Sequence, residues 1–125
     1  MIPHLDHRVL STRDRDRCVD FYTPVLGMRR EMFGEGRITF RVGCPGINLL
    51  EAGREFEPKA EQPPPGALDL CFLAGEPLDG VVRRLQAAGI SIDAGPVART
   101  GATGPIRSVY VRDPDGKRIE IPAPA

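Results

Sequence analysis

The chain repeats one pattern of predicted elements, and this repeat limits its fold more than any other feature. Each half reads as strand, helix, strand, strand, strand. The glycines that end the two predicted helices, Gly27 and Gly89, lie 62 positions apart, whereas the last strands, at Ile47 and Ile119, lie 72 positions apart. The difference between these offsets matches the glycine-rich stretch 99–105, which the first half lacks.

Apolar spacing gives the elements of the first half. Alternation predicts a strand over 4–11, and residues 12–14 offer caps for a helix whose apolar residues recur at helical spacing. Pro24 is expected to kink or break the last turn of this helix before Gly27 ends it. Three further strands are predicted, over 28–33, 37–42 and 47–51.

The second half follows the same order. A strand is predicted over 67–74, and a helix begins after Pro77 and ends at Gly89. Strands follow over 91–99 and 106–112, and a turn at Asp113-Pro114-Asp115-Gly116 leads into the final strand. We therefore predict an α+β fold of two βαβββ modules, 1–53 and 67–125, joined by a proline-rich linker over 54–66 and forming together one domain with an open, cupped sheet.

Composition narrows the functional classes. The chain has 125 residues, 17 basic and 17 acidic, so its formal net charge is zero. No basic stripe or membrane-length apolar run is visible, and we expect neither nucleic acid nor membrane as a partner. The start of the chain lacks a secretory signal pattern, and the three cysteines have no CxxC spacing. We expect a cytoplasmic protein with buried free thiols.

Four polar residues interrupt the apolar strands at repeat-equivalent positions. Glu120 lies between Ile119 and Ile121, so it faces away from the side that they bury. The offset of 62 positions between the helix-ending glycines relates His7 to Asp69. The offset of 72 positions between the last strands relates Asn48 to Glu120. Two like modules paired about a pseudo-two-fold axis would bring all four residues to one concave centre, which is a plausible ligand cup.

These residue types suit an open metal site, although each also has a simpler explanation. A histidine with carboxylates can bind Mn²⁺, Fe²⁺, Ni²⁺ or Zn²⁺, and the ion can act as a Lewis acid on two adjacent substrate oxygens. Alternatively, His7 is a core histidine, Asp69 caps a turn and Asn48 bonds backbone. Glu120 would then be a solvated residue beside Arg118.

Three segments resemble the vicinal-oxygen-chelate superfamily, which includes glyoxalase I, bleomycin- and fosfomycin-resistance proteins and extradiol dioxygenases. They are Leu5-Asp6-His7-Arg8-Val9, the run from Asp20 to Met28, and Asp113-Pro114-Asp115-Gly116 with Ile119-Glu120. Residues 56–60, 95–97 and 99–102 look like the glyoxalase-domain-containing protein 5 type. The resemblance implies paired βαβββ modules around a divalent metal, commonly in a homodimer.

The resemblance also assigns roles. His7 and Glu120 match the metal ligands of the first and last strands, and Asp69 stands where the family usually has a second histidine. Asn48 stands where glyoxalase I has a glutamate ligand, which implies a substrate-facing residue here. The metal ligands expected are therefore His7, Asp69 and Glu120.

The resemblance also indicates which residues would act on or bind the substrate. Tyr110 with Asp113, Pro114, Gly116 and Glu120 fits the pattern of ring-cleaving dioxygenases, but Thr103 occupies the place of their acid–base histidine. A threonine does not transfer protons near neutral pH, so family-type ring cleavage is not expected. Glu120 and Tyr110 are the catalytic candidates, and Asn48, Thr103, Arg107 and Tyr110 are the substrate-binding candidates.

Two functions remain open. The first is a metal-dependent enzyme, lyase-like or dioxygenase-like, that acts on a compact oxygen-rich small molecule by Lewis-acid chemistry. The alternative is a non-catalytic protein that sequesters a ligand, as bleomycin-resistance proteins do. Such a ligand-sequestering protein would need no metal for binding.

Overall fold

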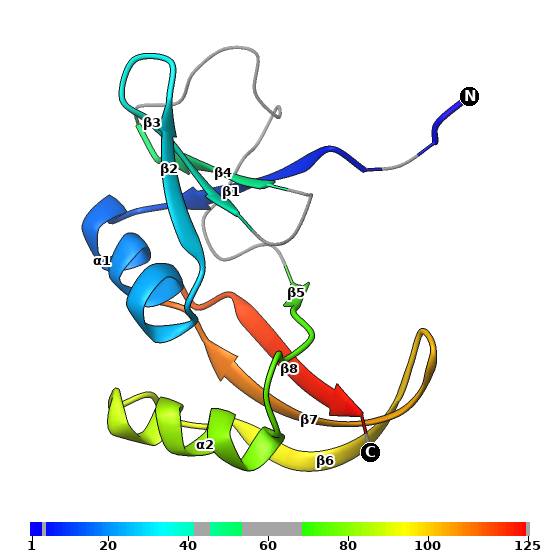
Figure 1. The fold of residues 1–125 in the computed structure, drawn as a ribbon. Helices are drawn as coiled ribbons and strands as arrows, with labels where there is room; N and C mark the ends of the chain where they lie inside the picture. The colour runs from blue at the N-terminus through cyan, green and yellow to red at the C-terminus, as the bar shows by residue number, and fades with distance from the viewer. Residues whose placement is uncertain (4, 42–45, 54–68, 125) are drawn as a thin grey trace. The chain divides into compact units, whose positions relative to one another are not determined.

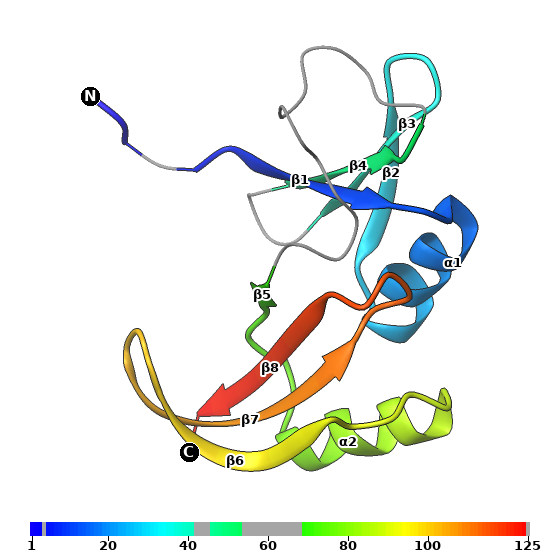
Figure 2. The ribbon, with the colours of Figure 1, turned by 180° about the vertical axis from the view of Figure 1, so that it is seen from behind.

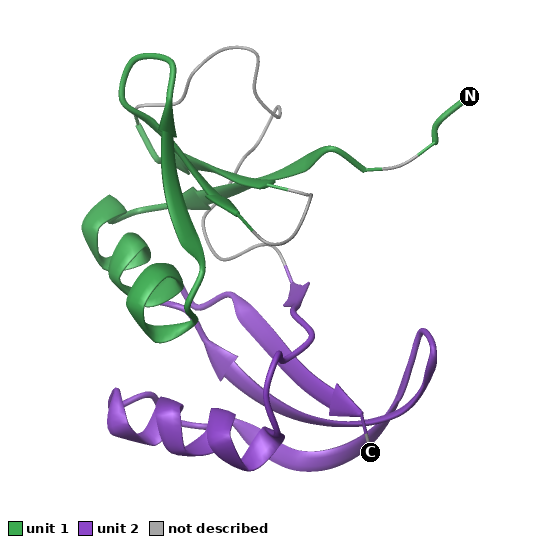
Figure 3. Cartoon of the chain, viewed as in Figure 1, with its two compact units in different colours: residues 1–67 green, residues 68–125 purple. Residues whose placement is uncertain are grey.

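The computed structural model describes residues 1–3, 5–41, 46–53 and 69–124. The chain divides into two compact units, Met1–Ala67 and Leu68–Ala125, which Figure 3 shows in different colours. The predicted linker 54–66 lies outside the described residues. The module bounds and the joining of both modules into one domain therefore stay predictions.

Unit 1 has the predicted order of elements, which Figure 1 shows from blue to green. A first strand leads into a short α-helix that continues as one π-helical segment, and three strands follow. The elements are β1 (His7–Thr12), α1 (Arg15–Asp20), η1 (Phe21–Val25), β2 (Arg29–Phe33), β3 (Arg37–Arg41) and β4 (Gly46–Glu51).

Unit 2 repeats this order, as the view from behind in Figure 2 also shows. Its elements are β5 (Leu70–Cys71), α2 (Leu78–Ala87), β6 (Ala94–Gly101), β7 (Gly104–Arg112) and β8 (Arg118–Pro124). The strand order is β1-β4-β3-β2 in one sheet and β5-β8-β7-β6 in the other. In each sheet, the first strand pairs in parallel with the last, and the other pairs are antiparallel.

The strand register confirms the internal repeat. Val9 pairs with Asn48 between β1 and β4, and Cys71 pairs with Glu120 between β5 and β8. Cys71 and Val9 differ by the 62 positions that separate the helix-ending glycines, and Glu120 and Asn48 differ by the 72 positions of the final strands. The α+β fold of two βαβββ modules is thereby confirmed.

One face of each sheet carries the core. In unit 1, the Tyr22 ring of η1 stacks on Phe40 of β3 at 5.3 Å between centroids, and its edge meets Phe21 at 5.1 Å. In unit 2, a stripe of α2 and the facing side chains of the sheet are buried. These buried residues of unit 2 are Leu70, Leu78, Val81, Leu85, Val109, Val111, Ile119 and Ile121.

The helix ends follow the predicted local chemistry. Asp14 caps α1, because its carboxylate accepts a hydrogen bond from the backbone N–H of Arg17 at 3.2 Å. Pro24 lies inside η1, so the α-helix changes its hydrogen bonding there, and Gly27 ends the segment with a φ of 77°. Gly89, with a φ of 74°, ends α2 in the same way.

Several predicted element bounds were wrong. The first strand begins at His7, not at residue 4, and β5 is assigned only to Leu70–Cys71. Hydrogen bonds from Phe72 N to Glu120 O and from Ala74 N to Pro122 O nevertheless continue its ladder. Strands were predicted over 91–99 and 106–112, but β6 begins at Ala94, and both strands extend through the glycine-rich stretch to a tight hairpin at Ala102 and Thr103.

The turn before β8 has the predicted sequence chemistry. The Asp113 side chain is 4 % exposed, and its Oδ1 accepts from the backbone N–H of Asp115 at 2.9 Å and of Lys117 at 2.8 Å. The Gly116 N–H bonds the Asp113 carbonyl at 2.9 Å, and the φ of Gly116 is 84°. This turn sets the register in which β7 meets β8.

We predict that Asp113→Ala lowers the free energy of unfolding by about 3 kcal/mol, because the buried N–H of Lys117 and the partly buried N–H of Asp115 lose a shared acceptor. Asp113→Asn keeps one acceptor oxygen and is expected to cost about 1 kcal/mol. Urea denaturation followed by circular dichroism measures both. Equal stability of Asp113→Ala and the unchanged protein would contradict this account of the turn.

Among the described residues, no helix has the length and apolar character needed to cross a membrane.

Candidate functional site

The sheet face opposite the helix, here called the helix-free face, carries a group of polar residues in unit 1. Cross-strand pairing arranges them in two rows. One row runs across the four strands as His7, Gly46, Arg41 and Arg29, and the next row runs as Val9, Asn48, Thr39 and Glu31. Two predicted site residues, His7 and Asn48, therefore lie on one face in adjacent rows.

His7 is oriented by its neighbour in sequence. Its Nδ1 lies 2.8 Å from Oδ2 of Asp6. Because an ionised carboxylate only accepts hydrogen bonds, Nδ1 carries the proton of the neutral ring, and Nε2 keeps its lone pair. A carboxylate that holds the remote nitrogen is the usual arrangement around a metal-binding histidine.

A hollow of about 280 Å³ lies beside His7. Its lining comes from β1, β2, β3 and β4, and consists of Asp6, His7, Glu31, Met32, Phe33, Thr39, Arg41, Gly46 and Asn48. Thr39 is 4 % exposed, and among the described residues its Oγ1 has no hydrogen-bond partner. Leaving a buried hydroxyl unpaired costs about 1–3 kcal/mol, so a partner from outside the chain would be favoured here.

Glu31 fixes two arginines of this face. Its Oε1 accepts from Arg29 Nη2 and its Oε2 from Arg41 Nε, both at 2.7 Å. The hydrogen bond from Arg41 holds the pKa of the Glu31 carboxyl below its usual value, and Arg29 adds to this effect. The same bond raises the pKa of Arg41, with a further contribution from Asp6. The carboxylate therefore keeps the guanidinium in place across the neutral range.

Glu120 lies on the helix-free face of unit 2, as the alternation of β8 predicted. Its strand neighbours Ile119 and Ile121 are buried on the other side. Ser108 Oγ donates to Glu120 Oε2 at 2.7 Å, which orients the carboxylate. Asp69 is exposed and comes directly before the buried Leu70 of β5.

Tyr110 pairs with Glu120 across the strands but is enclosed by two arginines. It is only 5 % exposed. Arg99 Nε donates to its hydroxyl at 3.0 Å, and the Arg118 guanidinium lies 4.1 Å from its ring centroid. The sequence pattern did not indicate that Arg99 and Arg118 meet at Tyr110. Arg118 shares a face with Tyr110 through the β7–β8 register, and Arg99 shares it through the β6–β7 register.

Cys71 was expected to be buried, and this was wrong. Its side chain is exposed, because it pairs with Glu120 on the helix-free face and not with the core. Partial burial raises the pKa of the Cys71 thiol, and the Glu120 carboxylate raises it further. Cys18 is buried as expected, whereas Cys44 lies outside the described residues.

The structure does not bring Arg107 and Thr103 together with Glu120. Arg107 alternates with Ser108, so it lies on the other face of β7 and lines a hollow beside the start of α2. Thr103 is exposed at the tip of the β6–β7 hairpin. Their assignment as substrate-binding residues stays a prediction.

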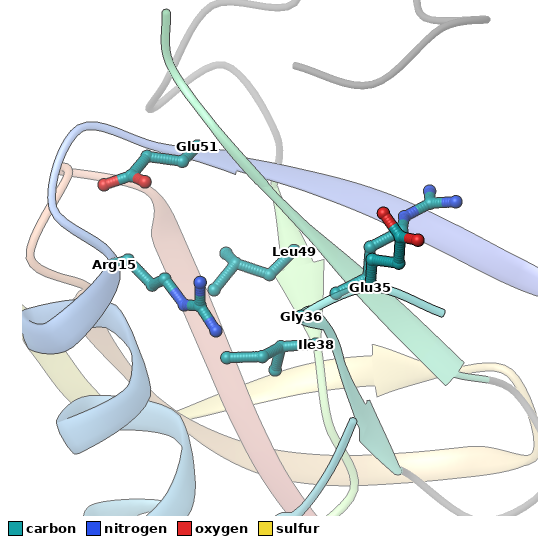
Figure 4. Close-up of a pocket in the computed structure, with 7 residues that line it drawn as sticks. Arg15, Glu35, Gly36, Ile38, Leu49 and Glu51 are labelled. Atoms are coloured by element: carbon teal, nitrogen blue, oxygen red, sulfur yellow. The ribbon is translucent and has the colours of Figure 1, made fainter. Parts of the chain in front are cut away.

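Another hollow, of about 240 Å³, lies on the helix side of the unit 1 sheet, where Ile38 and Leu49 form its apolar wall. Figure 4 shows Arg15 and Glu51 on one side of it and Glu35 on the other. It is separate from the face that carries His7 and Asn48. Within either unit, the described part of the chain holds no group of three or more His, Cys, Asp or Glu side chains suited to a metal.

We predict that Glu120→Gln makes Cys71 more reactive toward iodoacetamide at about pH 8, by roughly two- to fivefold, because removing the carboxylate charge lowers the thiol pKa. Peptide-resolved mass spectrometry separates Cys71 from the other cysteines. Asp79→Asn, which removes a carboxylate on α2, is the matched control and should leave the rate unchanged. If Glu120→Gln and Asp79→Asn react alike, Glu120 does not face Cys71.

Known proteins are similar in sequence to this chain along nearly its whole length. The chain is 48% identical over 121 residues to virulence protein STM3117 of Salmonella typhimurium, covering 97% of this chain and 84% of that protein. It is 50% identical over 117 residues to glyoxalase domain-containing protein RDO1 of Mycosarcoma maydis, covering 94% of this chain and 66% of that protein.

A solved structure extends the likeness to three dimensions. The integron cassette protein VCH_CASS1, from the mobile metagenome of V. Cholerae, superposes with a TM-score of 0.94 at 45% identity, covering 100% of this chain and 98% of that one. The family model described as Glyoxalase/Bleomycin resistance protein/Dioxygenase superfamily matches residues 4–121. The chain therefore belongs to the glyoxalase/bleomycin resistance protein/dioxygenase superfamily.

Proposed function

We propose that the protein is a divalent-metal-dependent enzyme of this superfamily, with His7, Asp69 and Glu120 as the metal ligands and a compact oxygen-rich molecule as substrate. Proteins of this superfamily commonly use divalent metals. The observation that carries the proposal is the pair of oriented donors. Asp6 holds His7 at Nδ1, which leaves its Nε2 the atom that a metal would take, and Ser108 holds Glu120 at Oε2, which leaves its Oε1 for the same role. A protein that only packs these strands has no need of either arrangement.

The donor chemistry fits such an ion. One imidazole nitrogen and two carboxylates form a harder set than two histidines and one carboxylate, which favours Mn²⁺ or Fe²⁺ over Cu²⁺ or a thiolate-bound metal. When bound, the metal would act as a Lewis acid toward two adjacent substrate oxygens. Its identity among Mn²⁺, Fe²⁺, Ni²⁺ and Zn²⁺ is left to experiment.

The chain's own residues supply positioning and charge. Asn48, one row from His7, offers an amide that can donate to or accept from a substrate oxygen. Glu120 is the candidate for holding a proton at Oε1 when it is not engaged by the ion. Tyr110 is better suited to placing Arg99 and Arg118 than to proton transfer, because Arg99 already donates to its hydroxyl.

The second candidate is a protein that binds its ligand without transforming it. The changes from the family pattern at Asp69, Asn48 and Thr103 favour it, since each removes a residue that a known family reaction uses. Val9, an exposed apolar residue in the same row as Asn48, would then contact the ligand. We further propose that the protein is a homodimer that works in the cytoplasm.

We predict that the purified protein binds about one equivalent of Mn²⁺ or Fe²⁺ per chain, and that His7→Ala and Glu120→Ala each lose it. Asp6→Asn keeps the ligand but weakens its orientation, so metal affinity should fall roughly 10- to 100-fold. Elemental analysis and calorimetric titration provide the measurement.

Asp79→Asn, whose carboxylate is on α2, is the control and should bind metal normally. Circular dichroism checks that every variant folds. Absence of metal binding in the unchanged protein would overturn the enzyme proposal and leave the ligand-binding function.

A further inference from the structure

We propose that the hollow on the helix-free face of unit 1 is a carboxylate subsite, in which Thr39 Oγ1 and Arg41 Nη1 hold one carboxylate oxygen above Gly46. That the carboxylate belongs to the substrate rests on the function proposed above. The subsite itself is independent of any metal and is tested without one.

Thr39 supplies the first donor. It projects from the middle of β3 onto the helix-free face between Asn48 and Glu31, and it lines the hollow while being almost fully buried. Its hydroxyl has no hydrogen-bond partner among the described residues. A valine would fill the same volume without an unpaired polar atom, so the hydroxyl at this position points to a partner outside the chain.

Gly46 lets the two donors come close together. A Cβ on this residue would lie 2.8 Å from Thr39 Oγ1 and 3.5 Å from Arg41 Nη1. Any residue larger than glycine would therefore collide with the Thr39 hydroxyl and displace it. The hollow that Thr39, Arg41 and Gly46 line together provides the space in which one carboxylate oxygen would accept from both donors.

Arg41 supplies the second donor and the charge. Its Nε is taken by Glu31 Oε2 at 2.7 Å, which fixes the plane of the guanidinium and leaves Nη1 beside Gly46. Glu31 is itself held by Arg29, so the group of two arginines and one glutamate carries a net charge of about +1. A charged hydrogen bond from a fixed guanidinium is the usual means of holding a carboxylate.

The remaining charges limit the ligand. Asp6 and Glu31 line the same hollow, so two carboxylates lie near the bound group. They would repel a doubly charged phosphate or phosphonate more strongly than a singly charged carboxylate. The volume of about 280 Å³ admits only a small molecule.

The subsite lies next to His7 in the sheet. Gly46 pairs with His7 on one side and with Arg41 on the other. Adjacent strands are about 4.8 Å apart, so a carboxylate above Gly46 lies next to the side chain of His7. The substrate class that fits is a small organic acid whose carboxylate neighbours the oxygens that would reach the metal.

Titration of the ¹⁵N-labelled full-length protein with acetate, in the presence of EDTA, tests the subsite. We expect the largest amide shift changes at Thr39 and Gly46, with acetate binding about tenfold weaker in Thr39→Val and restored in Thr39→Ser. Gly46→Ala should also abolish the response while keeping the fold. Acetamide and inorganic phosphate, titrated in parallel, should bind more weakly than acetate.

Equal acetate affinity in Thr39→Val and the unchanged protein, or shift changes spread over surface arginines, would overturn the subsite. Tighter binding of acetamide or phosphate would overturn its assignment to a carboxylate. Because EDTA removes divalent ions, failure of the metal proposal leaves this result unchanged. Conversely, normal metal binding with no acetate response would refute the subsite alone.

Discussion

A single helical layer covers one face of each four-stranded sheet, and this constraint determines where the chemistry lies. Strand side chains alternate, so the residues that interrupt an apolar strand must face away from the helix. Ile119 and Ile121 enter the core of unit 2, and Glu120 between them cannot. In unit 1, the same alternation places Ile38 and Phe40 on the face that the helix covers and Thr39 on the helix-free face. The helix-free faces thereby collect His7, Asn48, Thr39 and Glu120.

Polar residues on these faces are held by partners close in the sheet. Asp6 orients His7, Ser108 orients Glu120, and Glu31 fixes Arg41. Each partner removes a rotational degree of freedom from a functional group and leaves another of its atoms for a ligand. Tyr110 has the same role for Arg99 and Arg118. These held groups are the ones that the proposed function assigns to the metal and the substrate.

Local patterns predicted the elements and the repeat because alternation, helical spacing and turn residues act over a few positions. The offsets of 62 and 72 positions agree with the observed register, in which Val9 pairs with Asn48 and Cys71 pairs with Glu120. Strand register, in contrast, is not encoded in a short segment. It decides that Cys71 is exposed, which face of β7 carries Arg107, and that Thr39 lies against Gly46. If strand residues are counted in both directions from the Asp113–Gly116 turn, Ser108 and Tyr110 fall on the same sheet face as Glu120. Arg107 falls on the other face. The hollow over Gly46 needed three strands at once and had no sequence signal.

The central proposal is that the protein binds a divalent metal ion through His7, Asp69 and Glu120. Paramagnetic broadening by Mn²⁺ of the backbone amide signals of the full-length protein tests it most directly. The account predicts the strongest broadening around His7 in unit 1 and around Cys71 and Glu120 in unit 2, at the same low metal concentration. Broadening confined to one unit, or centred on the helix sides of the sheets, would contradict it.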